Sequence, residues 1–328
     1  MAWKVNKRRQ YIIWSFFMLV SILALIAFLN WQWIYDFGRG LSYKPSDEMQ
    51  RIWGSLELTE RGGFLFKASM PTLNEGEEFN EKCRYGVDSE MAILGCYTEG
   101  NIYIYNITDT ELDGIRELTT AHELLHAVWA RMSEDERGNL SSALTQVYND
   151  NKDLLEKEIG SYGENERQEE LYVRAGTEVK NLPEVLEKHY AEIFKDQDKI
   201  VDFYEKYISV FNNIRAEMDE LMSEMENIKA EIDAKTAEYE QRIAQLNADI
   251  TIFNNCAETS GCFGSSSEFY ARREVLVREQ EALSMLYDEL NNLTSEYNEK
   301  VAKYNDDVTQ TEKLNNMINS NSKPSEVK

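Results

Sequence analysis

The sequence has 328 residues, enough for one or two domains with a sizeable core. It carries 59 acidic and 35 basic residues, a formal net charge of -24. This acidity argues against nucleic acid as a partner, because phosphate binding needs clustered lysine and arginine. We expect a solvated acidic surface that resists aggregation.

The N-terminal segment has the pattern of a membrane anchor. Residues 10–35 contain no charged side chain and provide the roughly 20 apolar residues that a helix needs to cross a bilayer core. Tryptophan and tyrosine lie near both ends of the segment, as in interfacial belts. The basic residues Lys4, Lys7, Arg8 and Arg9 precede it. Residues 1–36 are therefore predicted to be a cytoplasmic N-terminus and a single transmembrane signal-anchor, with the main body outside the cytoplasmic membrane. The alternative is a cleaved signal peptide, which the length of the apolar stretch disfavours.

The four cysteines form two pairs that are close in sequence, Cys83 with Cys96 and Cys256 with Cys262. Neither pair has the CxxC spacing of a zinc knuckle. An extracytoplasmic location favours two disulfides that close short loops, and the alternative is four free thiols in a reducing cytosol. Between the anchor and residue 100 the sequence mixes strand and turn signals. The pair Gly62-Gly63 is expected to break this segment, to which we assign no role.

The sequence Thr119–Trp129 contains the motif HExxH. On a helix, His122 and His126 share one face, so both imidazoles can reach one metal ion. Glu123 lies beside them and can accept a proton from a metal-bound water. The preceding residues 101–107 alternate like a strand at an exposed sheet edge, and residues 108–111 offer helix-starting chemistry. Ser133 to Glu136 forms a capping box, so the HExxH helix is expected to stop near Met132.

Residues 101 to about 207 resemble the zincin metallopeptidases, most closely the gluzincin arrangement, on the strength of His122, Glu123 and His126. The metzincin extension is absent, because Trp129 and Met132 occupy its glycine and third-histidine positions. The resemblance implies zinc, peptide-bond hydrolysis and a third ligand, a glutamate on a later helix.

The acidic stretch 164–178 has to provide this third ligand, and we predict Glu170, although the usual gluzincin spacings ExxA and NExxSD are not met there. Arg174 and Glu178 follow on the same helix face and can serve as its partners. Glu169 and Glu178 are the alternatives.

A further helix is predicted to open at Pro183 and to carry the remaining histidine. His189, or its neighbour Tyr190, could donate a hydrogen bond to the oxyanion that develops during hydrolysis. The alternative is that both are packing or surface residues.

From residue 201 apolar residues recur at heptad spacing, which predicts a coiled coil. A Gly/Ser-rich interruption between residues 256 and 267 precedes a second heptad run from Leu276 to Val308. Two long helices joined by a short loop are expected to form an antiparallel hairpin over residues 201–318, with Cys256–Cys262 at its tip and a disordered tail at 319–328. The hairpin would be a spacer or partner-docking rod, or would form a homo-oligomer. The apolar positions of the first run are Tyr204, Tyr207, Phe211, Ile214, Met218, Leu221, Met225, Ile228 and Ile232.

The predicted fold is mainly α: a transmembrane helix, a small α+β zincin-like domain over residues 37–200, and the hairpin. The predicted function is that of a membrane-anchored zinc peptidase acting on peptides or proteins outside the membrane. Zinc would be held by His122, His126 and Glu170, with Glu123 and His189 as catalytic groups. The rival hypothesis is an envelope scaffold or adaptor that acts through its coiled coil and has a structural or inactive metal site. A hydrolase of cell-wall peptides is a third possibility.

Overall fold

The computed structural model describes residues 7–83, 94–160 and 162–320. These residues are mainly helical, with one small mixed sheet and two long C-terminal helices, as predicted. In chain order the elements are α1 Lys7–Leu29, α2 Trp31–Ser42, α3 Asp47–Ser55, α4 Glu60–Ala68, β1 Thr72–Asn74, α5 Gly76–Lys82, β2 Gly95–Thr98, β3 Asn101–Tyr105, a 3-10 turn Thr110–Leu112, α6 Ile115–Trp129, α7 Glu134–Asp150, α8 Lys152–Ile159, α9 Glu164–Glu178, α10 Glu184–Tyr190, α11 Gln197–Glu258 and α12 Ser266–Ile318.

The chain divides into two compact units. One comprises residues up to Val210 together with the segment from Asn315 onward, and the other comprises Phe211–Leu314. The division lies within α11 and α12, so each long helix contributes to both units. The predicted hairpin, 201–318, begins inside α11, which starts at Gln197.

The first unit contains a three-stranded sheet with the order β1-β3-β2. Strand β1 is parallel to β3, and β2 is antiparallel to it. The prediction that residues 101–107 form an edge strand is therefore wrong, because β3 is paired on both sides, with β1 and with β2; among the described residues β2 lies at an edge. The alternation that suggested an edge reflects one face of β3 packed into the core, where Ile102 and Ile104 are fully buried.

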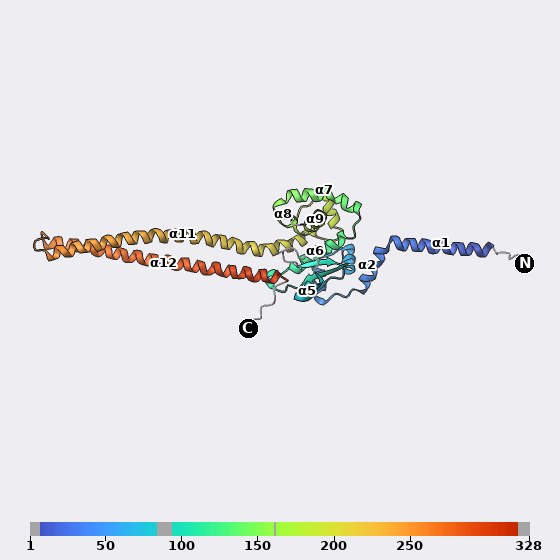
Figure 1. Ribbon diagram of the computed structural model, residues 1–328, viewed down its shortest axis with the longest axis horizontal. Helices are drawn as coiled ribbons and strands as arrows, with labels where there is room; N and C mark the ends of the chain where they lie inside the picture. Colours follow the sequence, from blue (N-terminus) through green and yellow to red (C-terminus); the bar gives the residue numbers. More distant parts are fainter. Residues whose placement is uncertain (1–6, 84–93, 161, 321–328) are drawn as a thin grey trace. The chain divides into compact units, whose positions relative to one another are not determined.

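Helix α6 runs through the middle of this unit. It packs on strands β2 and β3 on one side and on α9 on the other, and α7 and α8 pack against α9 (Figure 1). Leu124 and Leu125 are fully buried. Gly176 of α9 allows the two helices to approach closely: a Cβ at this position would lie 2.5 Å from Leu125 Cδ1. The helix that carries the HExxH motif is thus held rigidly in the core.

The described part of residues 37–100 is more helical than its sequence suggests. Gly62-Gly63 was expected to break it, and this is wrong, because both glycines lie inside α4. The tertiary structure explains the pair: a Cβ on Gly62 would lie 2.2 Å from the carbonyl oxygen of Ile193. Thr59 caps the helix by accepting a hydrogen bond from the Gly62 amide. The glycine is required for backbone contact rather than for a turn.

The N-terminal helices α1 and α2 follow each other with a bend of 71°. Among the described residues no single helix meets the length and composition expected of a membrane span, whereas Ile13–Leu29 and Trp31–Ser42 meet them together as a bent pair. The predicted anchor boundary at residue 36 falls within α2. Asp36 is buried there and accepts two hydrogen bonds from Arg131, each 2.9 Å long.

The second unit is an antiparallel pair formed by the outer parts of α11 and α12. Its cross-helix ion pairs join Glu224 to Lys300, Lys235 to Glu289 and Arg242 to Glu279, so positions rise on one helix as they fall on the other. The predicted heptad residues Ile214, Leu221 and Ile228 are buried at intervals of seven. The two long C-terminal helices are present as predicted, and their parts within this unit run antiparallel to each other.

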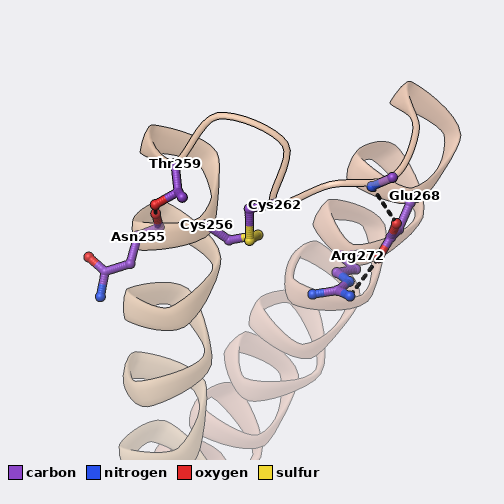
Figure 2. Close-up of a disulfide and its surroundings, with 7 residues drawn as sticks. Asn255, Cys256, Thr259, Cys262, Glu268 and Arg272 are labelled. Atoms are coloured by element: carbon purple, nitrogen blue, oxygen red, sulfur yellow. Dashed lines mark hydrogen bonds and ion pairs between the residues drawn. A yellow bond between two sulfur atoms is a disulfide. The ribbon is translucent and has the colours of Figure 1, made fainter.

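Both predicted disulfides are present. Cys256–Cys262 closes the connection between the two long helices, and Figure 2 shows it with the Arg272–Glu268 ion pair on the opposite arm. Cys83–Cys96 joins the end of α5 to β2, and the interior of its loop, 84–93, lies outside the described residues. Of the predicted tail, residues 321–328 also lie outside them, whereas the Ser320 carbonyl accepts a 2.8 Å hydrogen bond from Asn80.

Candidate metal centre

Helix α6 presents the HExxH residues to α9. It begins after Gly114, whose φ of +97° requires glycine, and ends at Trp129. The predicted capping box at Ser133 and Glu136 is present and starts α7. His122 and His126 are four positions apart and lie on one face, and their ring centroids are 5.1 Å apart.

Glu170 of α9 completes a group that can hold a metal ion. One nitrogen from each of His122 and His126 and one Glu170 oxygen all lie within 4.8 Å of one another. Glu170 Oε2 is 3.5 Å from His126 Nε2, and its Oε1 is 3.8 Å from His122 Nε2. Ligand atoms placed tetrahedrally around zinc at its usual bond lengths lie roughly 3.4 Å apart. The predicted third residue therefore converges with the two histidines at a spacing that suits a small divalent cation.

The polar neighbours hold these side chains in the orientation that metal binding needs. Glu169 Oε1 lies 2.8 Å from His126 Nδ1, so Nδ1–H can donate to this carboxylate, and Nε2, which faces Glu170, becomes a ligand atom once it has released its proton. Arg174 Nε donates a 2.6 Å hydrogen bond to Glu170, and its Nη1 donates a 2.9 Å bond to Glu178. Glu169 and Glu178, the alternative ligands from the sequence, are thus partners of the group rather than members of it.

The electrostatics of the group indicate a site that needs positive charge. Burial lowers the pKa of His122 to about 3. Burial also lowers the pKa of His126, but its hydrogen bonds to Glu169 and Glu170 outweigh burial and raise the pKa well above its usual value. Burial raises the pKa of Glu170, while the His126 hydrogen bond and the charges of His122 and Arg174 lower it to a net value of about 2. In the metal-free group, a proton on His126 thus balances the negative charge of Glu169 and Glu170, which a bound metal cation would balance instead.

Glu123 lies beneath the edge strand β2, and only 6% of its surface is exposed. Gly95 makes room for it, since a Cβ there would lie 2.9 Å from Glu123 Oε1. Burial raises the pKa of Glu123 to about 7, against a hydrogen bond from the Tyr97 backbone that lowers it. A carboxyl group with a pKa near neutrality can both accept and return a proton at physiological pH.

Tyr162, just before α9, is a neighbour of the group that the sequence did not reveal. Its phenol is hydrogen-bonded to Arg174, and burial together with the charge of Glu170 raises its pKa to about 12. The phenol therefore keeps its proton at neutral pH and can donate it. The sequence signal was weak: a tyrosine flanked by Gly160 and Gly163 ahead of the ligand helix.

His189 lies in a different set of contacts. Its Nε2 is 2.9 Å from Tyr172 Oη, and burial lowers its pKa. Its charged neighbours are Arg61, Glu136 and Glu192, none of which belongs to the metal group. Tyr190 is fully buried and donates its hydroxyl to the Tyr172 carbonyl. Neither His189 nor Tyr190 belongs to the group formed by His122, His126 and Glu170.

Three kinds of comparison were made with known proteins. A scan against protein-family models, a search of curated proteins and a search of solved structures each return no match to this chain.

Proposed function

We propose that the chain is a membrane-anchored zinc peptidase that acts outside the cytoplasmic membrane. The observation that carries the proposal is the convergence of His122, His126 and Glu170 from two packed helices, with Glu123 buried beside them. Two imidazoles and one carboxylate are a donor set typical of catalytic zinc, which keeps a further position open for water or substrate. A purely structural site has no need of the base.

Different side chains would have different roles in hydrolysis. Zinc held by the three ligands would supply Lewis acidity, making water more acidic and a carbonyl more electrophilic. Glu123 would accept the proton of the attacking water and deliver it to the leaving amine, which its pKa of about 7 allows. Tyr162, protonated at neutral pH, would donate a hydrogen bond to the developing oxyanion.

The open edge of the sheet supports a peptide as substrate. Among the described residues β2 pairs only with β3, so its outer side has no strand partner. Gly95 and Tyr97 of this strand contact Glu123. An extended peptide that paired with β2 would therefore lie next to the proposed base, by the strand-addition mode of recognition.

The proposed location rests on three features. Two disulfides form readily outside the cytoplasm. The apolar α1 and its bent continuation α2 have the composition of an anchor. Basic residues precede the apolar run, which places the N-terminus inside and the main body outside.

Metal content and activity measured on the same variants would test the proposal. The full chain would be purified in detergent, stripped of metal, reloaded and analysed for zinc. We expect about one zinc in the wild type, loss of zinc in His122→Ala and Glu170→Gln, and retention in Glu123→Gln without peptidase activity. Glu166→Gln, an exposed carboxylate on the same helix as Glu170, is the matched control and should behave as wild type.

The rival function, a scaffold that acts through the hairpin, is favoured by one observation. The α11–α12 pair is held by cross-helix ion pairs and a terminal disulfide, which suits a stiff spacer or docking rod. A folded wild type that takes up no zinc would reject the peptidase. If the wild type and Glu123→Gln both bind zinc but neither hydrolyses any peptide, the scaffold with a structural metal would be favoured.

A further inference from the structure

Helix α2 is amphipathic in the reverse sense of an ordinary surface helix. Its polar residues face the protein: Asp36 is 2% exposed and pairs with Arg131, while Arg39 donates hydrogen bonds to the Ala68 carbonyl at 2.6 Å and to the Gly100 carbonyl at 2.9 Å. Its apolar residues are exposed instead. They are Trp31, Trp33, Ile34, Tyr35, Phe37 and Leu41, with exposed fractions between 42% and 73%.

Such a face is unfavourable in water. Scattered apolar residues are common on protein surfaces, but six on one twelve-residue helix form a contiguous patch of the kind that marks an interaction site. Tryptophan and tyrosine are the residues enriched at the boundary between lipid and water. The patch also follows directly on α1, after a bend of 71° at Asn30. A helix that turns at the end of a span can lie along the membrane surface.

A groove of about 500 Å³ adjoins the patch, between α2, α3 and α4. Phe37, Trp53 and Phe64 line it with aromatic surface, whereas Lys67 and Lys195 add two positive charges and Glu60 one negative charge. The Lys67 ammonium lies 5.0 Å from the Trp53 ring centroid. Within the described part of the chain neither lysine makes an ion pair. The groove thus combines two lysines and one glutamate with an aromatic lining, and the charge of Lys195 also acts on Glu57.

We propose that α2 lies in the membrane interface and that the adjoining groove binds one anionic phospholipid, with an acyl chain against Phe37, Trp53 and Phe64 and the phosphate between Lys67 and Lys195. The inference rests on the proposed membrane anchoring and is independent of the peptidase activity. The lysines supply charge complementarity to an anionic headgroup, and the aromatic floor supplies a surface for its acyl chain. The acidic remainder of the chain would be repelled by the same lipids, so the contact would be confined to this surface.

The position of α2 can be tested in the full chain in lipid nanodiscs. All four natural cysteines are in disulfides, so an introduced cysteine is the only free thiol. A fluorophore would be attached at Ile34→Cys or Leu41→Cys, and at Lys188→Cys, an exposed control on α10. We expect nitroxide-bearing lipids to quench the first two labels and not the third. Equal quenching of all three by an aqueous quencher, in a chain that stays with the nanodisc, would overturn the placement of α2. A chain that does not enter the nanodisc would instead reject the anchor itself.

The lipid site can be tested by native mass spectrometry of the detergent-solubilised full chain. Phosphatidylglycerol and phosphatidylcholine would each be titrated against the wild type, the double variant Lys67→Gln/Lys195→Gln and the control Lys152→Gln/Lys188→Gln, whose lysines are exposed elsewhere.

We expect one phosphatidylglycerol to bind in preference to phosphatidylcholine, and the groove variant to lose about fivefold in affinity for each lysine removed. The control should retain the preference, and glycerol phosphate without acyl chains should not compete. Equal binding of both lipids to the wild type, or an equal loss in the control, would overturn the proposal.

Discussion

Replacement of Gly176 by alanine tests whether the close packing of α6 on α9 builds the metal centre. The new Cβ would lie 2.5 Å from Leu125 Cδ1 and 2.7 Å from Tyr190 Cε1. Carbon atoms in contact are normally about 3.5–4.0 Å apart, so the helices would have to separate. Neither neighbour can move aside easily, since both are fully buried and the Tyr190 hydroxyl is hydrogen-bonded to the Tyr172 carbonyl.

The expected magnitude follows from two opposing effects. Overpacking a well-packed core costs about 1–3 kcal/mol, whereas alanine is favoured over glycine inside a helix by about 0.5–1 kcal/mol. Gly138 of α7 is the matched control, because no atom lies within 4 Å of its added Cβ. We therefore expect Gly138→Ala to be neutral or stabilising, and Gly176→Ala to be less stable than Gly138→Ala by roughly 1–3 kcal/mol.

Tryptophan fluorescence during denaturant unfolding is the assay, because all six tryptophans belong to the unit that contains the site and none to Phe211–Leu314. Leu125 precedes the ligand His126, so a separation of α6 from α9 should also move His126 away from Glu170. We expect zinc affinity to fall by about tenfold, the size of effect that follows the loss of a contact supporting a metal ligand. A Gly176→Ala chain with the stability of Gly138→Ala and the zinc affinity of the wild type would refute the reasoning.

Three further predictions concern the same unit. Glu169→Ala should lower zinc affinity by about 10–100-fold, measured by competition with a chelator, since the carboxylate orients His126; an unchanged affinity would contradict this role. Zinc binding at neutral pH should release a proton, because the pKa of His126 is raised in the metal-free protein and the metal needs the neutral ring. Affinity should thus rise as pH rises from neutrality, and calorimetry in two buffers of different ionisation enthalpy measures the release. Asp36→Ala should destabilise the unit by about 3–5 kcal/mol, because it leaves Arg131 buried and unpaired, whereas Arg51→Ala, which breaks an exposed pair, should cost less than about 1 kcal/mol; equal unfolding midpoints would reject the prediction.

Local spacing in the sequence determined several features of this protein. A separation of four residues places His122 and His126 on one helix face wherever the helix packs. The heptad patterns on either side of the Gly/Ser-rich interruption similarly predict a helical hairpin. Cys256 and Cys262 are six positions apart at this interruption, which predicts a disulfide at the tip of the hairpin. These features depend on residues close in the chain, so elementary helix geometry is sufficient to predict them.

Only the tertiary structure decided which glutamate joins the histidines. Glu169 and Glu170 are adjacent on α9 and point about 100° apart, and the crossing of α9 over α6 directs one to the metal group and the other to His126 Nδ1. The same holds for the central position of β3 and for Gly62 against Ile193. Each depends on contacts between residues distant in the chain, and no local pattern specifies these, because they arise from how whole elements pack.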